Sequence, residues 1–217
     1  TDTLTNIENV VGGRGNDSLV GSDQANELWG NAGSDIFAGG LGNDTIDGHR
    51  QPSDGDLRSP PPLPDSNLDI AFYGFTFATQ GIHADLSLGL VRDGSDTIGF
   101  NDAALDAILS GSGFLDTLRN VEGIIGSDFA DTIKGGNPNH VTTGSLRTDP
   151  FEILEGGAGN DIIDGGDALP THNDILSWRD NTPSAGIVVN LGSTNLSITH
   201  PDHGPVTVAG GTALDGY

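Results

Sequence analysis

A pattern of nine residues recurs along this chain and constrains its fold more than any other feature. It reads G-G-x-G-x-D-x-U-x, where U is a large apolar residue. A repeat this short cannot bury its own apolar residue, so successive copies must stack on one another. Three copies are complete: residues 12–20, 39–47 and 156–164. Residues 30–38 form a copy with a single mismatch at Asn31, and residues 21–29 and 126–134 are weaker copies.

Each position of the pattern has its own physical role. Glycine adopts positive φ without steric cost and lets the backbone approach a bound ion closely. The aspartate supplies a hard carboxylate oxygen and the tight turn supplies carbonyl oxygens, and a site made only of oxygen ligands suits Ca²⁺. The apolar eighth residue is expected to point inward from a very short strand, so that stacked repeats bury a thin column: Leu19, Leu28, Phe37 and Ile46.

In these repeats the chain resembles the RTX (repeats-in-toxin) family, a calcium-binding nonapeptide-repeat family of large proteins that bacteria export. The resemblance implies an all-β fold of parallel β-roll blocks (a β-helix or solenoid) with intervening short β-strand pairs and loops. It also implies two nonapeptides per coil, so that repeat n lies over repeat n+2 with Ca²⁺ between them. Asp17 should then lie over Asp35, and Asn26 over Asp44.

The predicted metal ligands lie in the glycine-rich turns, and Ca²⁺ is the expected ion. Asn26 lacks the charge of aspartate, so its site should be weaker unless Asp23 or Glu8 assists. The sequence leaves open whether Glu8, Glu122 and Glu152 are ligands or face solvent. The full candidate set is Gly12, Arg14, Gly15, Asp17, Asp23, Asn26, Gly30, Ala32, Gly33, Asp35, Gly39, Leu41, Gly42, Asp44, Asp128, Asp131, Gly156, Ala158, Gly159 and Asp161.

Two similar segments suggest that a larger module has been repeated. Residues 1–11 and 115–125 align at an offset of 114, and each is expected to be the first coil of a separate roll. The predicted organisation has five parts: a first RTX β-roll at residues 1–48, a proline-rich loop at 49–68, a β-strand segment with a short helix at 69–113, a second roll with an inserted loop at 114–166, and a second, truncated β-strand segment at 167–217.

The segments outside the rolls carry weaker signals. Residues 69–88 read as a pair of short strands, and the layout returns at residues 174–191. Residues 101–110 have helical spacing and are followed by Gly111. His200 and His203 suggest a transition-metal site, but a polar surface loop is the favoured interpretation because no third ligand is near in sequence.

Composition narrows the function. The 217 residues include 31 acidic and 8 basic ones, a net charge of -23, so nucleic acid and anionic membranes are poor partners. Cysteine is absent, which excludes disulfides and thiol nucleophiles. There is no apolar run of membrane-spanning length and no signal peptide, and we expect the segment to come from a longer chain. Neither a G-x-S-x-G nor an H-E-x-x-H motif occurs, so we predict no enzyme activity within the segment.

The sequence therefore predicts a calcium-binding structural or adhesive module of an extracellular or cell-surface bacterial protein. The resemblance implies type I secretion, with folding on calcium after export. Its partners would be calcium ions and possible further modules of the same chain or cell-surface and matrix components, without membrane insertion. The alternative is the non-catalytic RTX module of a secreted enzyme such as an epimerase, metalloprotease or lipase. Ice binding, which would use a flat row of threonine side chains, is disfavoured because outward positions such as Asn16 and Ser34 are not threonine.

Overall fold

Very short strands separated by glycine-rich turns build the main unit of this protein, which we describe from a computed structural model. The structure describes residues 3–49, 68–74, 80–92, 113–136, 152–166, 174–177, 187–200, 204–209 and 212–215. The chain divides into two units, Thr1–Ser177 and Trp178–Tyr217. Each unit is described by itself.

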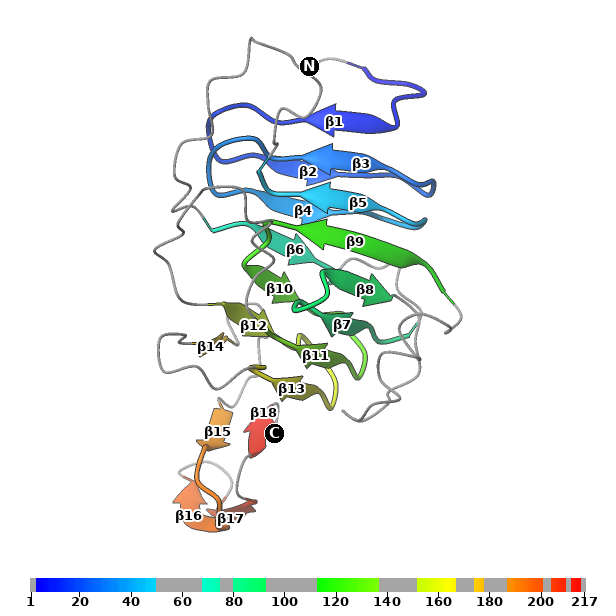
Figure 1. Ribbon diagram of the computed structural model, residues 1–217. Coiled ribbons are helices and arrows are strands. Elements are labelled where there is room, and N and C mark those ends of the chain that lie inside the picture. Colours follow the sequence, from blue (N-terminus) through cyan, green and yellow to red (C-terminus); the bar gives the residue numbers. More distant parts are fainter. Residues whose placement is uncertain are drawn as a thin grey trace. The chain divides into compact units, whose positions relative to one another are not determined.

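The first unit stacks its strands into two sheets (Figure 1). An eight-stranded sheet has the order β1 (Asn9–Val11), β3 (Glu27–Trp29), β5 (Thr45–Asp47), β9 (Leu115–Arg119), β8 (Leu90–Arg92), β7 (His83–Asp85), β11 (Thr132–Lys134) and β13 (Ile162–Asp164). A six-stranded sheet has the order β14 (Ile175–Leu176), β12 (Ile153–Glu155), β10 (Gly123–Ile125), β6 (Ile70–Phe72), β4 (Ile36–Ala38) and β2 (Ser18–Val20).

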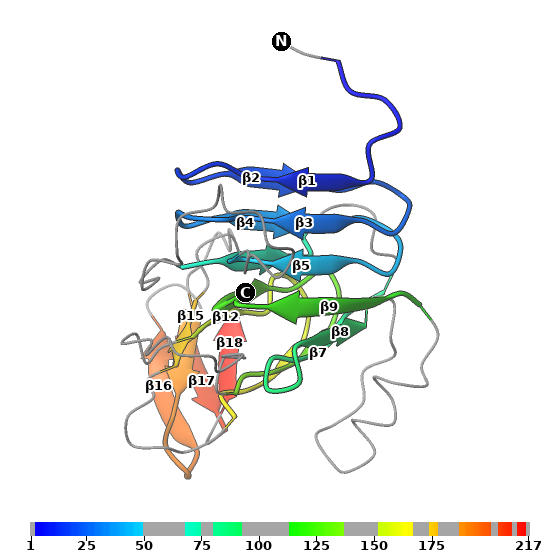
Figure 2. The same cartoon turned by 45° about the horizontal axis from the view of Figure 1, so that its top comes forward.

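Parallel pairing between every second repeat produces the stack, as the nine-residue period predicts. Ser18 of β2 is in register with Ile36 of β4, and Glu27 of β3 is in register with Thr45 of β5. Turning the molecule shows successive coils lying one beneath the other (Figure 2). The all-β parallel β-roll expected from the sequence is therefore confirmed for the repeats.

The core is the predicted apolar column, extended along the whole stack. Leu28, Phe37 and Ile46 are fully buried, and Leu19 at the open end is half-buried. Each is the middle residue of a three-residue strand, and its two neighbours point to the other face of the sheet. The column continues through Ala71, Ala84, Leu118, Ile124, Ile133 and Leu154.

The prediction of two separate rolls is wrong, because both sheets run without a break through the two repeat blocks. Strand β5 of the first block pairs with β9, and β4 pairs with β6, which in turn pairs with β10. Residues 115–125 are thus a central coil of one stack instead of the start of a second. Burial explains this outcome, since each coil covers the apolar end of its neighbour and two separate rolls would leave two more ends exposed.

The predicted strand pair at residues 69–88 is also wrong. Its two halves lie in different sheets: β6 pairs with β4 and β10, whereas β7 pairs with β11 and β8. Strand β8 is the antiparallel member of its sheet, and it lies between β7 and β9. In the second predicted strand segment, β14 pairs with β12, whereas β15 (Ile187–Asn190) belongs to the second unit.

The second unit contains two antiparallel strand pairs. Strand β15 pairs with β18 (Thr212–Asp215), and β16 (Leu196–His200) pairs with β17 (Gly204–Val208). The side-chain hydroxyls of Ser197 and Thr207 lie 3.0 Å apart across the second pair. The predicted helix at 101–110, nearly all of the predicted loop at 49–68 and His203 lie outside the described residues.

Candidate metal centre in the stacked turns

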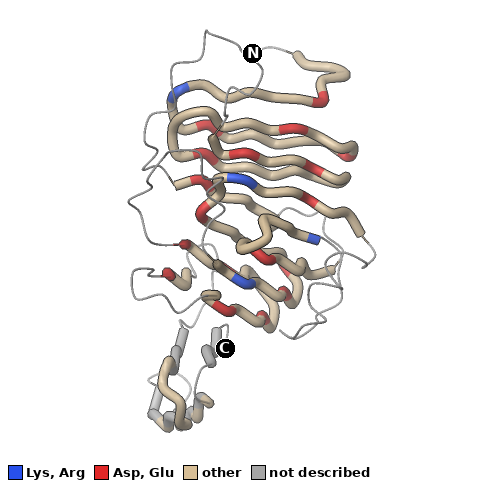
Figure 3. The backbone as a smooth tube through the Cα atoms, viewed as in Figure 1, with Lys and Arg blue, Asp and Glu red and all other residues tan. Residues whose placement is uncertain are grey.

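A ladder of side chains, all acidic except Asn26, runs down each side of the stack. One rung lies just before the residues that pair in parallel in each strand other than β7 and β8, which follow Ile82 and Gly89. We call these residues the acidic ladder. Along the six-stranded sheet its members are Asp17, Asp35, Asp69, Glu122, Glu152 and Asp174; along the eight-stranded sheet they are Glu8, Asn26, Asp44, Asp116, Asp131 and Asp161. Figure 3 shows the acidic positions recurring from coil to coil.

Hydrogen bonds join the rungs in one direction. The backbone N–H of Asp17 donates to Oδ1 of Asp35 (2.8 Å), and the N–H of Asp35 donates to Oδ1 of Asp69 (2.8 Å). On the other side the N–H of Asn26 donates to Oδ1 of Asp44 (2.8 Å). The predicted stacking of Asp17 over Asp35 and of Asn26 over Asp44 is therefore confirmed.

A rung side chain also accepts from its own turn, four residues back. Ser22 N–H donates to Oδ1 of Asn26 (2.7 Å), and Ser127 N–H donates to Oδ2 of Asp131 (2.7 Å). Gly13 N–H does the same for Oδ2 of Asp17. These bonds hold each side chain over its own turn, so that its oxygens point to the inside of the turn.

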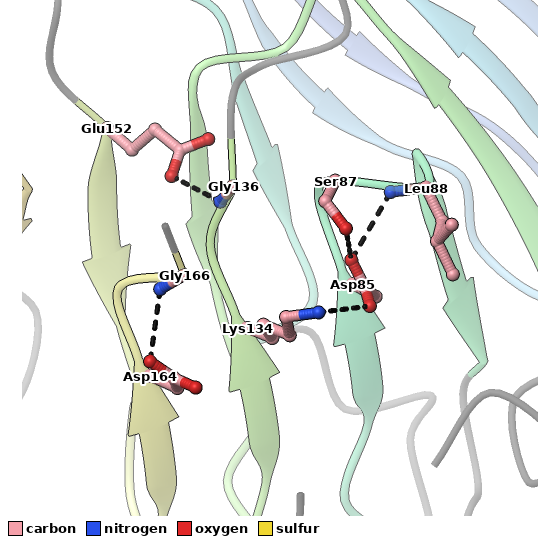
Figure 4. Close-up of polar contacts among 8 residues, drawn as sticks. All are labelled: Asp85, Ser87, Leu88, Lys134, Gly136, Glu152, Asp164 and Gly166. Atoms are coloured by element: carbon pink, nitrogen blue, oxygen red, sulfur yellow. Dashed lines mark hydrogen bonds and ion pairs between the residues drawn. The ribbon is translucent and has the colours of Figure 1, made fainter. Parts of the chain in front are cut away.

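Glu152 reproduces this bond across an inserted segment. Gly136 N–H donates to its Oε2 at 2.8 Å, although the two residues are 16 apart in sequence (Figure 4). The carboxylate therefore takes the place that the aspartate has in an uninterrupted repeat. Glu152 and Glu122 are both 2 % exposed, whereas Glu8 is exposed, so only Glu8 faces solvent.

Six complete turns stack as three pairs, and these contain every predicted ligand. We call them turn pairs one, two and three. Pair one joins residues 12–17 and 30–35, pair two joins residues 21–26 and 39–44, and pair three joins residues 126–131 and 156–161.

Carboxylate and carbonyl oxygens meet at the first glycine of a turn. A methyl group placed on Gly12 would lie 2.5 Å from both Oδ2 of Asp17 and the carbonyl oxygen of Gly30. On Gly126 it would lie 2.3 Å from both Oδ2 of Asp131 and the carbonyl oxygen of Gly156. Only glycine permits this approach, which brings oxygens of two stacked turns to one place.

In turns 30–35, 39–44 and 156–161, the second and fourth residues adopt the positive φ that glycine favours. Gly33 has φ 124° and Gly159 has φ 126°, and both pack against the carbonyl of the turn above. Asn31, the one mismatch in its repeat, has φ 82°, close to Gly157 at 86°. Asparagine tolerates this region better than other side chains, so the mismatch preserves the turn.

The third turn residues differ between the pairs. Arg14, Ala32, Leu41 and Ala158 hold this position in four of the turns, where only a backbone carbonyl is available as a ligand. Asp23 and Asp128 hold it in turns 21–26 and 126–131, and both side chains are exposed. Pairs two and three therefore have an additional carboxylate near the rim of the site.

Burial makes these turns costly without a cation. Asp35, Asp44 and Asp131 are 0 to 1 % exposed. Burial raises the pKa of Asp131 to about 7, and the neighbouring charge of Asp161 acts in the same direction. Hydrogen bonds from Ile82 N–H and Ser127 oppose that rise and do not cancel it. A cation bound at this position would favour the charged carboxylate instead.

The donor set fits calcium. Within the described residues no three side chains of His, Cys, Asp or Glu gather as a metal-binding group. A metal here would take carboxylates from the ladder and carbonyls from the turns, an all-oxygen set of the kind that Ca²⁺ prefers and that suits zinc poorly. Oxygens of both turns of a pair meet at the first glycine, so an ion bound there would also join the two coils.

Some rungs were missed by the sequence pattern. Asp69 and Asp116 are each 1 % exposed, yet neither is preceded by the nine-residue pattern. A weaker signal does exist, because Asp69 precedes a three-residue apolar strand just as Asp35 does. The residue before such a strand identifies a rung even where the turn has been replaced.

Comparison with known proteins agrees with the repeats. Residues 11–46 and 151–168 match the family model described as the RTX calcium-binding nonapeptide repeat (4 copies). These ranges include turn pairs one and two and the second turn of pair three. The comparison with curated proteins finds no match.

Proposed function

Because residues 11–46 and 151–168 carry RTX calcium-binding nonapeptide repeats, we propose that this chain is a calcium-dependent structural module of an exported bacterial protein. The three stacked turn pairs carry the proposal. Each brings buried carboxylate and carbonyl oxygens of two coils together, and no lysine or arginine lies in any of these turns except Arg14. An ion that joins the coils of each pair would therefore hold the stack together.

The proposed role is mechanical and not catalytic. The buried acids of the ladder lie in repeating backbone turns, and each is held by backbone N–H groups rather than placed opposite a nucleophile or base. A module of this kind would serve an exported protein as a rigid spacer or an adhesive support. Within the described residues no helix is long and apolar enough to cross a membrane.

Outside the cell, calcium reaches the millimolar range that such modules need, with dissociation constants on the order of 10⁻⁴ to 10⁻³ M. Most of the chain would remain unfolded in a cytosol with little free calcium and would fold after export. A second function is favoured by the same repeats: support of a catalytic domain elsewhere in a secreted enzyme. The neighbouring sequence of the parent protein distinguishes these roles, since a hydrolase or protease motif there would favour the enzyme.

Calcium titration of the whole chain tests the binding proposal. We expect isothermal titration calorimetry in ion-stripped buffer to show one ion for each turn pair. Asp161→Asn should remove the ion of pair three and leave those of pairs one and two. A chain that binds no calcium at millimolar concentrations would overturn the proposal.

A further inference from the structure

The centre of the stack lacks the complete turns that form the candidate metal sites. The segment between β9 and β10 has only three residues, 120–122, which is too short for a glycine-rich turn of six. Asp69 and Asp116 belong to the ladder but are not preceded by the repeat pattern. The coils are nevertheless packed in register there, because β6 pairs with both β4 and β10.

At the centre of the stack, a side-chain hydroxyl donates to one rung of the ladder in addition to the usual bond from a backbone N–H. The hydroxyl of Tyr73 donates to Oδ2 of Asp116 (2.9 Å), while Asp44 N–H donates to Oδ1 of the same carboxylate (2.9 Å). Asp116 therefore accepts hydrogen bonds from the residue that follows β6 and from the residue that precedes β5. Neither bond requires a metal.

A column of side-chain bonds joins the turns on the other side of the stack. Asn31 Nδ2 donates to the carbonyl of Gly13 (2.8 Å), and Nδ1 of His49 lies 2.9 Å from the carbonyl of Asn31. Asn120 Nδ2 then donates to Oδ1 of Asp47 (2.7 Å) and to the carbonyl of His49 (3.3 Å). The Asn31 bond lies within turn pair one itself, whereas the Asn120 bonds connect the central coil to Asp47 and His49. At Asn120 one coil is therefore joined to the next by side-chain bonds that involve no ion.

Charge and packing distinguish the centre from the open ends of the stack. Of the four described basic residues, Arg92 lies in β8 and Arg119 in β9, where Arg119 is in register with Asp47 of β5. Figure 3 shows where basic and acidic positions occur along the stack. The central strands supply fully or nearly fully buried apolar residues, with Ile124 at 0 % and Leu118 at 3 % exposure. At the ends of the stack Val10 and Ile163 are only partly buried.

We propose that residues 68–74 and 113–125 form a seam that keeps its fold without calcium, between two arms whose turns need the ion. The N-terminal arm contains turn pairs one and two, and the C-terminal arm contains turn pair three. The inference rests on the proposed function, because the arms must respond to calcium for the seam to differ from them. Loss of calcium would then open the arms from their ends and leave the centre folded.

Hydrogen–deuterium exchange of the whole chain, with chelator and with millimolar calcium, tests the seam. In chelator we expect slow exchange at the amides of Tyr73, Glu122 and Gly123, which donate to carbonyls of neighbouring coils. Amides of residues 12–17, 39–44 and 156–161 should exchange fast in chelator and slowly in calcium. Equal loss of protection in seam and arms would overturn the seam, whereas protection everywhere that calcium does not change would overturn the proposed function.

Tyr73→Phe tests the internal donor. We expect amides of residues 115–119 to exchange roughly tenfold faster in chelator, because a buried carboxylate loses a hydrogen bond. Ser197→Ala is the matched control, since it removes one hydroxyl contact in the second unit. Unchanged exchange at residues 115–119 in Tyr73→Phe would overturn the role of Tyr73 in the seam.

Discussion

At the scale of single residues, one carboxylate serves both the backbone and the proposed ion. Asp35 accepts the N–H of Asp17 and at the same time is buried within turn pair one. The hydrogen bond fixes its direction, so the entropy of ordering the ligand is lost on folding rather than on binding. Aspartate is short enough to be held this way above a tight turn, which explains its place in the repeat.

Replacing Asp35 with asparagine should weaken calcium binding and leave the geometry of the turn unchanged. Asp35→Asn keeps the shape and an acceptor for Asp17 N–H but removes the charge. We expect the calcium midpoint of folding to rise about tenfold, as for the loss of roughly 1.4 kcal/mol. Circular dichroism during calcium titration measures it.

Two controls accompany this substitution. Asp164→Asn makes the same change at an exposed strand residue that bonds Gly166 N–H (Figure 4), and His200→Ala changes a residue of β16 in the second unit. Neither should move the midpoint. Equal shifts in Asp35→Asn and Asp164→Asn would mean that general charge, not the turn, controls binding.

Gly33 provides a test of backbone geometry. Its φ is 124°, and an added methyl group would lie 2.5 Å from the carbonyl oxygen of Gly15. Gly33→Ala should lower the free energy of unfolding in calcium by at least about 1–2 kcal/mol, the usual cost of a side chain in this region. Gly15→Ala is the control, because nothing lies within 4 Å of its added methyl group. Chemical denaturation at fixed calcium compares the two, and similar losses would contradict this account.

At the scale of elements, sequence predicted the regular repeats well and the inserted ones poorly. The period of nine gave the register of β2 with β4 because no residue interrupts it. After Gly48 the next rung is Asp69, so the period is lost although Gly48 still packs against that carboxylate. An insertion of this kind still allows the coils to stack, but it removes the nine-residue period from the sequence. The sequence analysis therefore did not predict a single continuous stack.

The antiparallel strand β8 was missed for a different reason. Residues 82–90 carry an apolar residue at every second position, a pattern that fits a strand in either direction, and it ends at Leu90-Val91 where β8 begins. Its pairing with β9 and β7 interrupts the ladder of the eight-stranded sheet, where Ile82 N–H donates to Oδ1 of Asp131 (2.6 Å). Figure 4 shows that Asp85 of β7 instead contacts Lys134 of β11 (3.3 Å). Direction depends on these tertiary contacts and not on local pattern.

From the environment of Asp131 we predict that, without calcium, the stability of the C-terminal arm depends on pH. Burial raises the pKa of this folded carboxylate to about 7, against an ordinary value of 3.8. At a pH between 3.8 and 7 the folded form binds more protons than the unfolded form. The free energy of unfolding therefore rises as pH falls through 7, and the full gain from protonating Asp131 is reached below pH 3.8. Acid should thus partly replace calcium, by a few kcal/mol at most.

Far-ultraviolet circular dichroism of the whole chain in ion-stripped buffer at pH 5.5 and 7.5 checks this. The wild-type chain should show more β-structure at pH 5.5, and Asp131→Asn should remove much of the difference. In calcium the effect reverses, because protons compete with the ion for the carboxylate. A pH response of Asp131→Asn identical to that of the wild type would show that other carboxylates cause it.

At the scale of the whole molecule, charge opposes folding and the ion must offset it. The chain has 31 acidic and 8 basic residues, and many of the acids are brought within hydrogen-bonding distance of the next coil by stacking. Its 34 glycines lose more backbone entropy than other residues when they are ordered. The apolar core is one side chain wide, so it offsets only part of these costs.

Calcium should therefore drive folding of most of this chain. The sites exist only in the folded form, so binding free energy becomes folding free energy. We expect far-ultraviolet circular dichroism to show mainly coil in chelator, with a small β contribution from the seam, and a large gain of β-structure at millimolar calcium. Magnesium should substitute poorly, because it demands shorter bonds and near-octahedral geometry that carbonyls of two stacked turns do not provide. Full β-structure in chelator, or an equal response to both ions, would show that the turns fold without a specific ion.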